Sequence, residues 1–145
     1  MAFDLDEQLG FNLVRVANLF KREHGRALRE HKLTPEQWQA LATLWHHGTL
    51  KQAEIARVTM QDAPTVSRML ARMEQGGWLR RRADPDDARS SLVELTPKGL
   101  GVRHVLPNKL LRHFRAFLRD FPEADQRKLL GLLRQLRQAT GDLEA

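Results

Sequence analysis

The sequence has no cysteine among its 145 residues. This absence excludes disulfide bonds, thiolate zinc sites and redox sensing through cysteine, and it favours the cytoplasm as the compartment. No apolar run approaches the length of a membrane span, and the opening segment MAFDLDEQLG is acidic, unlike a signal peptide. Internal repeats and low-complexity tracts are lacking too. We therefore expect one cytoplasmic domain over residues 1–145, without a membrane partner.

Patterns typical of enzymes and metal sites are also lacking. Neither HxxxH nor HExxH occurs among the six histidines, and there is no glycine-rich phosphate loop. Asp84 and Asp87 are close in sequence, but an exposed loop is a poor place to tune a pKa. We expect no catalytic residue, no metal site and no cofactor, and an enzyme is kept only as an alternative of a different class.

The composition that is present is basic and able to fold. Hydrophobic residues make up 41% and charged residues 29% of the chain, which is enough to build a core. The net charge of +6 is unevenly distributed, since residues 49–82 carry +4 and residues 96–145 carry +5. Such an excess suits nucleic acid, an anionic membrane or no charged partner.

Apolar spacing and capping residues predict a mainly helical chain. A first helix is expected over about residues 6–30. In the next helix Thr34 is the expected N-cap, Pro35 lies in the first turn, and Gln37 completes a capping box. Gly48 is expected to end this helix.

Two shorter helices are expected over about residues 51–58 and 62–75. Asp62 is the expected N-cap of the second, which places Arg68 and Arg72 opposite its apolar face. Two helices in tight succession, the second with a basic exposed face, describe a helix-turn-helix. We expect the following side chains to lie in the core rather than on the surface or in a ligand site: Ile55, Ala56, Val58, Met60, Met69 and Met73.

A β-hairpin is predicted directly after the helix-turn-helix. Residues 78–82 and 91–95 are the expected strands, and the sequence DPDD supplies turn chemistry between them. Asp84 and Asp87 are expected to brace the loop by accepting hydrogen bonds from nearby arginines and backbone N–H groups. Arg89 is then left to point toward a DNA minor groove, whose negative potential attracts arginine.

The second helix of the pair suits a DNA major groove. The groove admits one helix, and arginine can donate two hydrogen bonds to a guanine edge, as expected for Arg68 and Arg72. Thr65 and Ser67 lie in the first turns, where hydroxyls meet bases or phosphates. The simpler alternative is that these basic residues form only a solvated face.

The last third of the chain is again helical. In LTPKG, Thr96 is the expected cap of a long helix that reaches about residue 120, and Pro107 should kink or split it. Pro122 should open a final helix rich in leucine. Its leucines complete either a monomer core or, as we favour, a dimer seam.

The segment QAEIARVTMQDAPTVSRMLARMEQGGWLRRRADPDDARSSLVELTPKG resembles the winged helix-turn-helix of the MarR family, the multiple antibiotic resistance regulators. The wing signature DxxDxR occurs as Asp84, Asp87 and Arg89, followed by LTPKG. LTPEQWQALATL and LLGLLRQL are similar as well, so the resemblance covers nearly the whole chain. It implies a mainly α fold with a small β-hairpin wing, a DNA-binding lobe over about residues 34–96, and dimerisation helices over about residues 6–31 and 97–141.

The resemblance also implies a function. It implies a homodimer that represses transcription at palindromic promoter DNA and is released by a small aromatic or phenolic anion. Trp38 and His31 are the candidate effector-pocket residues, although a core aromatic is the simpler interpretation of Trp38. A constitutive DNA-binding or architectural protein without an effector is the alternative.

Several positions match the family motif and others depart from it. Pro64, Thr65 and Arg68 fall at recognition-helix positions, and Arg89 at the wing tip. Lys51 stands where relatives often have Thr or Ser, so either Thr49 caps the short helix or the helix starts differently. The full set expected to contact DNA is Lys51, Gln52, Pro64, Thr65, Ser67, Arg68, Arg72 and Arg89.

Overall fold

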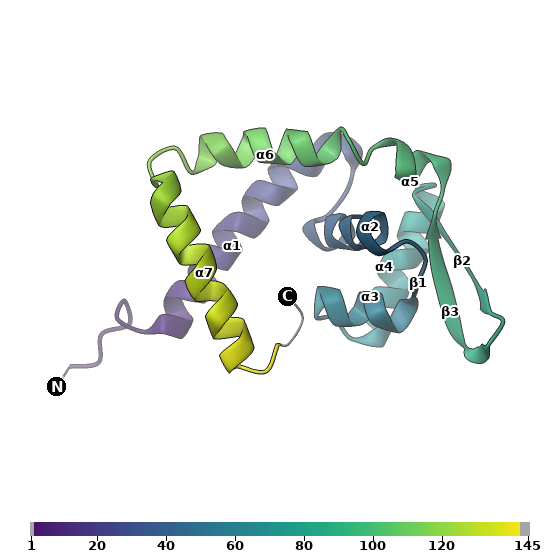
Figure 1. Ribbon diagram of the computed structural model, residues 1–145, viewed down its shortest axis with the longest axis horizontal. Helices are drawn as coiled ribbons and strands as arrows, with labels where there is room; N and C mark the ends of the chain where they lie inside the picture. Colours follow the sequence, from purple (N-terminus) through teal and green to yellow (C-terminus); the bar gives the residue numbers. More distant parts are fainter. Residues whose placement is uncertain (1, 143–145) are drawn as a thin grey trace. The chain divides into compact units, whose positions relative to one another are not determined.

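The computed structural model describes residues 2–142. The chain forms two compact units that divide between Leu110 and Leu111, and each is described by itself. Among the described residues, no helix has both the length and the apolar character that crossing a membrane requires. Its elements (Figure 1) are α1 (Leu9–Leu28), η1 (Arg29–His31), α2 (Pro35–His47), β1 (Leu50–Lys51), α3 (Gln52–Thr59), α4 (Ala63–Gln75), β2 (Leu79–Asp84), β3 (Asp87–Leu95), α5 (Pro97–Gly101), α6 (Leu106–Phe117) and α7 (Glu123–Ala139).

The capping predicted for α2 is confirmed atom by atom. The Gln37 backbone N–H donates to Thr34 Oγ1 at 3.2 Å, and the Thr34 N–H donates to Gln37 Oε1 at 2.9 Å. Gly48 closes the helix with a φ of +79°. Because these contacts involve only residues near one another in sequence, the pattern alone was sufficient to place the helix.

The helix-turn-helix consists of α3 and α4. Asp62 caps α4 by accepting the Thr65 N–H at 2.8 Å, as predicted. The start of α3 differs from the first of the two sequence alternatives, since its N-cap is Lys51 without any side-chain cap bond. Lys51 instead belongs to β1, a two-residue strand that the sequence did not reveal because its pairing partner lies in β3.

The core of the first unit collects side chains from α1 to α4, the sheet and the start of α6. Ile55, Met69 and Met73 are buried, as predicted. Val58 and Met60 were predicted inward and are 40% and 90% exposed. Met60 has a left-handed backbone, φ 51°, at the end of α3, so the chain turns there and directs the side chain outward. The largest fully buried side chains are Leu28, Leu41, Leu44, Ile55, Leu70, Met73, Leu79, Leu106, Val66 and Val93.

The sheet is antiparallel with strand order β1-β3-β2. The hairpin of β2 and β3 (Figure 1) is longer than predicted, because its pairing continues from Leu79↔Leu95 to Asp84↔Asp87. Only Pro85 and Asp86 remain outside the two strands. The outer half of the hairpin carries few apolar side chains, so no alternation of apolar and polar residues marked it as strand.

A compact junction joins the hairpin to α5. Thr96 Oγ1 accepts the Gly99 N–H at 3.2 Å and donates to the Gly77 carbonyl. Lys98 Nζ donates to the Gly76 carbonyl at 2.6 Å and lies 4.3 Å from the Trp78 ring centroid. The LTPKG sequence is therefore both a helix start and a clamp on the base of the hairpin.

The long helix predicted after Thr96 is split rather than kinked. Residues 102–105 separate α5 from α6, and Pro107 is the second residue of α6. Proline is tolerated in the first turn, where its missing N–H would have no helical partner. The last helix, α7, begins after Pro122 as predicted, and none of its residues is buried in the single chain.

Candidate nucleic-acid interface

Helix α4, the second helix of the helix-turn-helix, presents a basic surface. Arg68 and Arg72 are exposed, and Pro64 is exposed in the first turn. Arg68 Nη2 donates to Thr65 Oγ1 at 3.4 Å, a long and therefore weak bond. The Arg72 side chain has no partner among residues 2–142. These guanidinium groups keep most of their donors available to a ligand.

The wing tip is braced by backbone bonds. Asp84 Oδ1 accepts the Asp86 N–H at 2.9 Å, and Asp87 Oδ1 accepts the Arg89 N–H at 3.0 Å. Asp84 is buried, and its charged neighbour is Lys51, with Nζ 3.8 Å from Oδ2, rather than an arginine. The Arg89 side chain is exposed and is unpartnered within the described part of the chain.

The three consecutive arginines of β2 are all paired with carboxylates. Arg80 pairs with Glu94 Oε1 across the strands, and Arg82 Nε lies 3.6 Å from Glu94 Oε2. The hydrogen bond from Arg80, helped by the charges of both arginines, lowers the pKa of Glu94 and outweighs the opposing effect of burial. Within the hairpin, Glu94 therefore offsets part of the positive charge on this stretch.

The sequence did not identify Arg81 as a residue with structural contacts. Its Nε donates to Glu74 Oε1 at 2.7 Å, and its backbone N–H donates to Glu74 Oε2 at 3.2 Å. Its Nη1 lies within 3.3 Å of Gln52 Oε1, of the Ser67 carbonyl and of Ser67 Oγ. Hydrogen bonding from Arg81 lowers the pKa of Glu74 despite the raising effect of burial. Strand alternation is the signal that could have found it, because Arg81 faces opposite to Arg80 and Arg82.

The sequence-predicted DNA residues therefore fall into two groups. Lys51, Gln52 and Ser67 have side chains that contact the wing or its base. In the second group, Pro64, Arg68, Arg72 and Arg89 are exposed without a strong protein partner, and Thr65 is half-buried with a side-chain hydrogen bond to Asp62. The structure thus separates side chains that hold the interface together from those that face outward.

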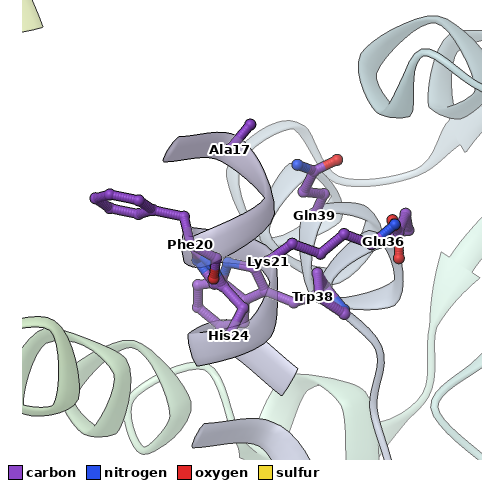
Figure 2. A pocket seen from close by; sticks show the side chains of 8 residues that line it. Ala17, Phe20, Lys21, His24, Glu36, Trp38 and Gln39 are labelled. Carbon is purple, nitrogen blue, oxygen red and sulfur yellow. The ribbon is translucent and has the colours of Figure 1, made fainter. Parts of the chain in front are cut away.

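A pocket of about 360 Å³ lies in the first unit between α1 and the start of α2 (Figure 2). Trp38, one of the two candidate effector residues, is in its wall and packs edge-on against Trp45, with ring centroids 5.5 Å apart. Lys21 Nζ lies 2.9 Å from Glu36 Oε1. The lining consists of Ala17, Phe20, Lys21, His24, Pro35, Glu36, Trp38 and Gln39.

The charges of the pocket offset one another. Burial raises the pKa of Glu36, but hydrogen bonding from Lys21, a backbone bond and the Lys21 charge together outweigh this effect and lower it. His31, the other candidate effector residue, is not part of the lining, and its Nδ1 is buried without a hydrogen-bond partner among the described residues. Across residues 2–142, no group of three or more His, Asp or Glu side chains could hold a metal ion.

Comparison with known sequences gives consistent matches. The model of the MarR family matches residues 33–91. The HTH-type transcriptional regulator TtmR of Methylorubrum extorquens is 35% identical over 99 residues, 68% of this chain and 51% of that protein, so the chain spans about half of TtmR. The uncharacterised HTH-type regulator YwoH of Bacillus subtilis is 31% identical over 122 residues, 84% of this chain and 88% of that protein.

A solved structure supports the same assignment. The transcriptional repressor CouR bound to a 23-mer DNA duplex matches with a TM-score of 0.83 and 25% identity, covering 94% of this chain and 99% of that chain. The predicted fold, mainly helical with a winged helix-turn-helix and a small antiparallel sheet, is confirmed.

Proposed function

This chain belongs to the MarR family of DNA-binding transcriptional regulators, and from that premise we propose that it is a repressor that binds a palindromic operator as a homodimer and is released by a small aromatic or phenolic anion. Members of this family are regulators rather than enzymes, so the enzyme alternative is excluded. The proposal extends the family assignment to the direction of regulation, the residues involved and the effector.

One observation carries the proposed DNA contact. Arg68, Arg72 and Arg89 keep their guanidinium donors available, whereas the arginines of β2 are paired with carboxylates. We propose that Arg68 and Arg72 enter the major groove with α4, accompanied by Pro64 and Thr65 at its N-terminus. Arg89 at the wing tip is proposed to enter the adjacent minor groove.

The remaining candidates receive a revised role. The side-chain oxygens of Gln52 and Ser67 already accept hydrogen bonds from Arg81. We therefore propose that these two residues position the interface or contact phosphates and do not read bases. The Lys51 ammonium group is proposed to interact with both the Asp84 carboxylate and a nearby DNA phosphate. The DNA-binding lobe proposed from these contacts is residues 34–96.

The homodimer is supported by apolar side chains that a single chain leaves uncovered. Soluble monomers rarely expose broad apolar patches, and a two-fold dimer covers the same patch on both copies. We propose that dimerisation uses residues 6–31 and 97–141. The exposed apolar residues of the first and last helices are Leu9, Val14, Val16, Leu19, Leu129, Leu130 and Leu132. A dimer would present its two recognition helices about 34 Å apart, or a multiple of that spacing.

Repression and its release are supported by two observations. CouR, the DNA-bound structural relative, is described as a repressor. The lining of the pocket between α1 and α2 includes the aromatic side chains of Phe20 and Trp38 together with Lys21 and His24, and Lys21 extends toward α2 (Figure 2). An aromatic anion would stack on these rings and would compete with Glu36 for Lys21. His31 lies outside this lining and is not part of the proposed contact set.

The Lys21–Glu36 pair favours a second candidate, a constitutive DNA-binding protein without an effector. The pair leaves the pocket with little net positive charge to attract an anion. A thermal-shift screen with aromatic carboxylates separates the two, because a ligand that binds the folded state raises its melting temperature.

The experiment that tests the proposal is a band-shift titration on duplexes selected from genomic fragments by the wild-type protein. We expect saturable binding of a dimer, with loss of the complex on adding 4-hydroxybenzoate or a related phenolic acid. A protein that stays monomeric at micromolar concentration and ignores every genomic fragment at low salt would contradict it.

A further inference from the structure

Arg80, Arg81 and Arg82 carry the same charge on one strand but differ in what they contact. Arg80 is 72% exposed in its side chain and, among residues 2–142, pairs with Glu94 alone, and Arg82 is 48% exposed beside the same carboxylate. The Arg81 side chain is 24% exposed and reaches groups on two helices. Strand alternation sends the middle arginine to the face that packs on the helix-turn-helix.

The contacts of Arg81 join three elements of the DNA-binding lobe. Arg81 itself is in β2, Gln52 is the first residue of α3, and Ser67 and Glu74 are in α4 about two turns apart. One guanidinium group therefore donates hydrogen bonds to α4 at two positions along the helix and also to Gln52 of α3. Arginine suits this task because its planar fork delivers several donors in fixed directions.

We propose that Arg81 is a positioning residue that holds the recognition helix and the wing in one relative geometry, so that sequence-specific binding depends on Arg81 although its own donors face the protein. This inference rests on the proposed DNA contacts of α4 and the wing. It assigns to Arg81 a role in specificity, whereas Arg68, Arg72 and Arg89 make the contacts themselves.

The chain between α4 and β2 explains why such a brace is needed. Only Gly76, Gly77 and Trp78 separate the two elements, and Gly77 has a φ of +78°. Glycine permits many backbone conformations, so contacts across this connection are needed to fix the angle of the wing, and the bonds from Thr96 and Lys98 to the Gly77 and Gly76 carbonyls already hold its base. The bonds from Arg81 to Glu74 and Ser67 cross the connection further along β2 and restrict that angle as well.

A direct phosphate contact by Arg81 is the competing explanation, and Glu74 distinguishes the two. If Arg81 served as a phosphate contact, removing the Glu74 charge would free it and strengthen binding to any duplex. If Arg81 is a positioning residue, Glu74→Gln removes its main anchor, and specific binding weakens relative to nonspecific binding. The first explanation thus predicts tighter binding to both duplexes with an unchanged ratio, and the second predicts a lower ratio of specific to nonspecific affinity.

The experiment compares Arg81→Gln with the matched variant Arg80→Gln, which removes the same charge from the same strand. The two probes are a duplex enriched by the wild-type protein from a randomised pool and a shuffled duplex of equal composition, and affinities are measured by fluorescence anisotropy. We expect Arg81→Gln to lower the ratio of specific to nonspecific affinity about tenfold, the scale of one misplaced base contact, and Arg80→Gln to change it less than about twofold.

Partial unfolding does not imitate this result, because a smaller folded fraction lowers both affinities equally and leaves their ratio unchanged. Arg81→Lys keeps one donor for Glu74 but cannot also serve Ser67 and Gln52, so an intermediate ratio is expected. Glu74→Gln should lower the ratio as well, and the double variant should be no worse than Arg81→Gln alone.

Two results would overturn the inference: equal ratios for Arg81→Gln and Arg80→Gln, or tighter binding of Glu74→Gln to both duplexes. Both results can occur while the wild-type protein still selects a duplex and the Arg68→Ala variant still binds that duplex more weakly. Failure of the proposed function is a different outcome, since no duplex would then be enriched by the wild-type protein.

Discussion

The carbonyl oxygen of Trp78 lies 2.1 Å from where a Cβ on Gly99 would be. Trp78 and Gly99 belong to the junction between the hairpin and α5. The Trp78 carbonyl also accepts the Thr96 N–H at 3.2 Å. Trp45 Nε1 also donates to the Gly99 carbonyl at 2.8 Å, so the glycine is held from two sides. The close approach of these backbones is possible only without a side chain at position 99.

Gly99→Ala should therefore lower the free energy of unfolding by about 3 kcal/mol, because the obstructing atom is backbone and cannot swing away. Chemical denaturation followed by tryptophan fluorescence measures the change. Gly101→Ala is the control at the end of the same helix, where a Cβ meets nothing within 4 Å. It should stay within about 0.5 kcal/mol of the wild type. Equal effects of the two substitutions would contradict the packing at the junction.

The recognition helix gives a second prediction. Arg68→Ala should cost about 1–3 kcal/mol in specific binding and relax the preference at one base position, if its guanidinium group reads a base edge. Selection from randomised DNA by the wild type and the variant, followed by sequencing, shows the relaxed position. An unchanged preference together with uniformly weaker binding would instead assign Arg68 to a phosphate.

The wing tip gives a third prediction, in which Arg89→Ala weakens binding most on duplexes whose flanks carry a narrow, A·T-rich minor groove. The physical reason is the more negative potential of such a groove, which the exposed guanidinium group would exploit. Competition between duplexes with A·T-rich and G·C-rich flanks measures this preference. If the variant kept the wild-type preference for A·T-rich over G·C-rich flanks, the proposed minor-groove contact of Arg89 would be wrong.

The pairing of Glu74 with Arg81 predicts a pH dependence of stability. The pKa of Glu74 is lowered in the folded state, so the pair stabilises the fold above the ordinary glutamate pKa of 4.5 and loses this effect as the pH falls through the lower folded value. The difference in unfolding free energy between the wild type and Glu74→Gln should hence shrink below about pH 4.5. In an Arg81→Gln background the same substitution should show no such pH dependence.

The uncovered leucines of α7 predict the oligomeric state. Leu130→Asp places a charge on a side chain that is 48% exposed in the single chain, and burial of that charge in a dimer seam is unfavourable. Light scattering should then find twice the chain mass for the wild type and one chain mass for the variant. Gln135→Glu adds the same charge at an exposed polar position of α7 and serves as the control. A dimer that persists in Leu130→Asp would place the seam elsewhere.

The features predicted well from the sequence are those set by neighbours along the chain. Thr34, Asp62 and Thr96 were identified as helix caps because a cap is made by residues within one turn of it. The outward position of Met60 was missed, since apolar character favoured burial while the left-handed turn at the end of α3 decided otherwise. Composition does not reveal such a turn at a residue that is not glycine.

The candidate site was predictable in outline but not in its internal contacts. Arg68, Arg72 and Arg89 were singled out by the motif and its charge. The partners of Asp84 and the whole contact set of Arg81 depend on segments brought together by folding, at separations that no local spacing reveals. Thus Gln52 and Ser67 looked like free polar groups in the sequence, although their side chains accept bonds from Arg81.

The carboxylate pairing of the β2 arginines has a consequence for how binding responds to ions in solution. A protein releases cations from a duplex in proportion to the number of phosphates that it neutralises. For each of these phosphates, the logarithm of the affinity falls by about 0.9 for every tenfold rise in salt concentration. Glu74 and Glu94 already pair with Arg80, Arg81 and Arg82, two negative charges against three positive ones, so these side chains should release fewer counterions than three unpaired arginines would. The slope of such a titration should therefore be shallower than the arginine content of the hairpin suggests.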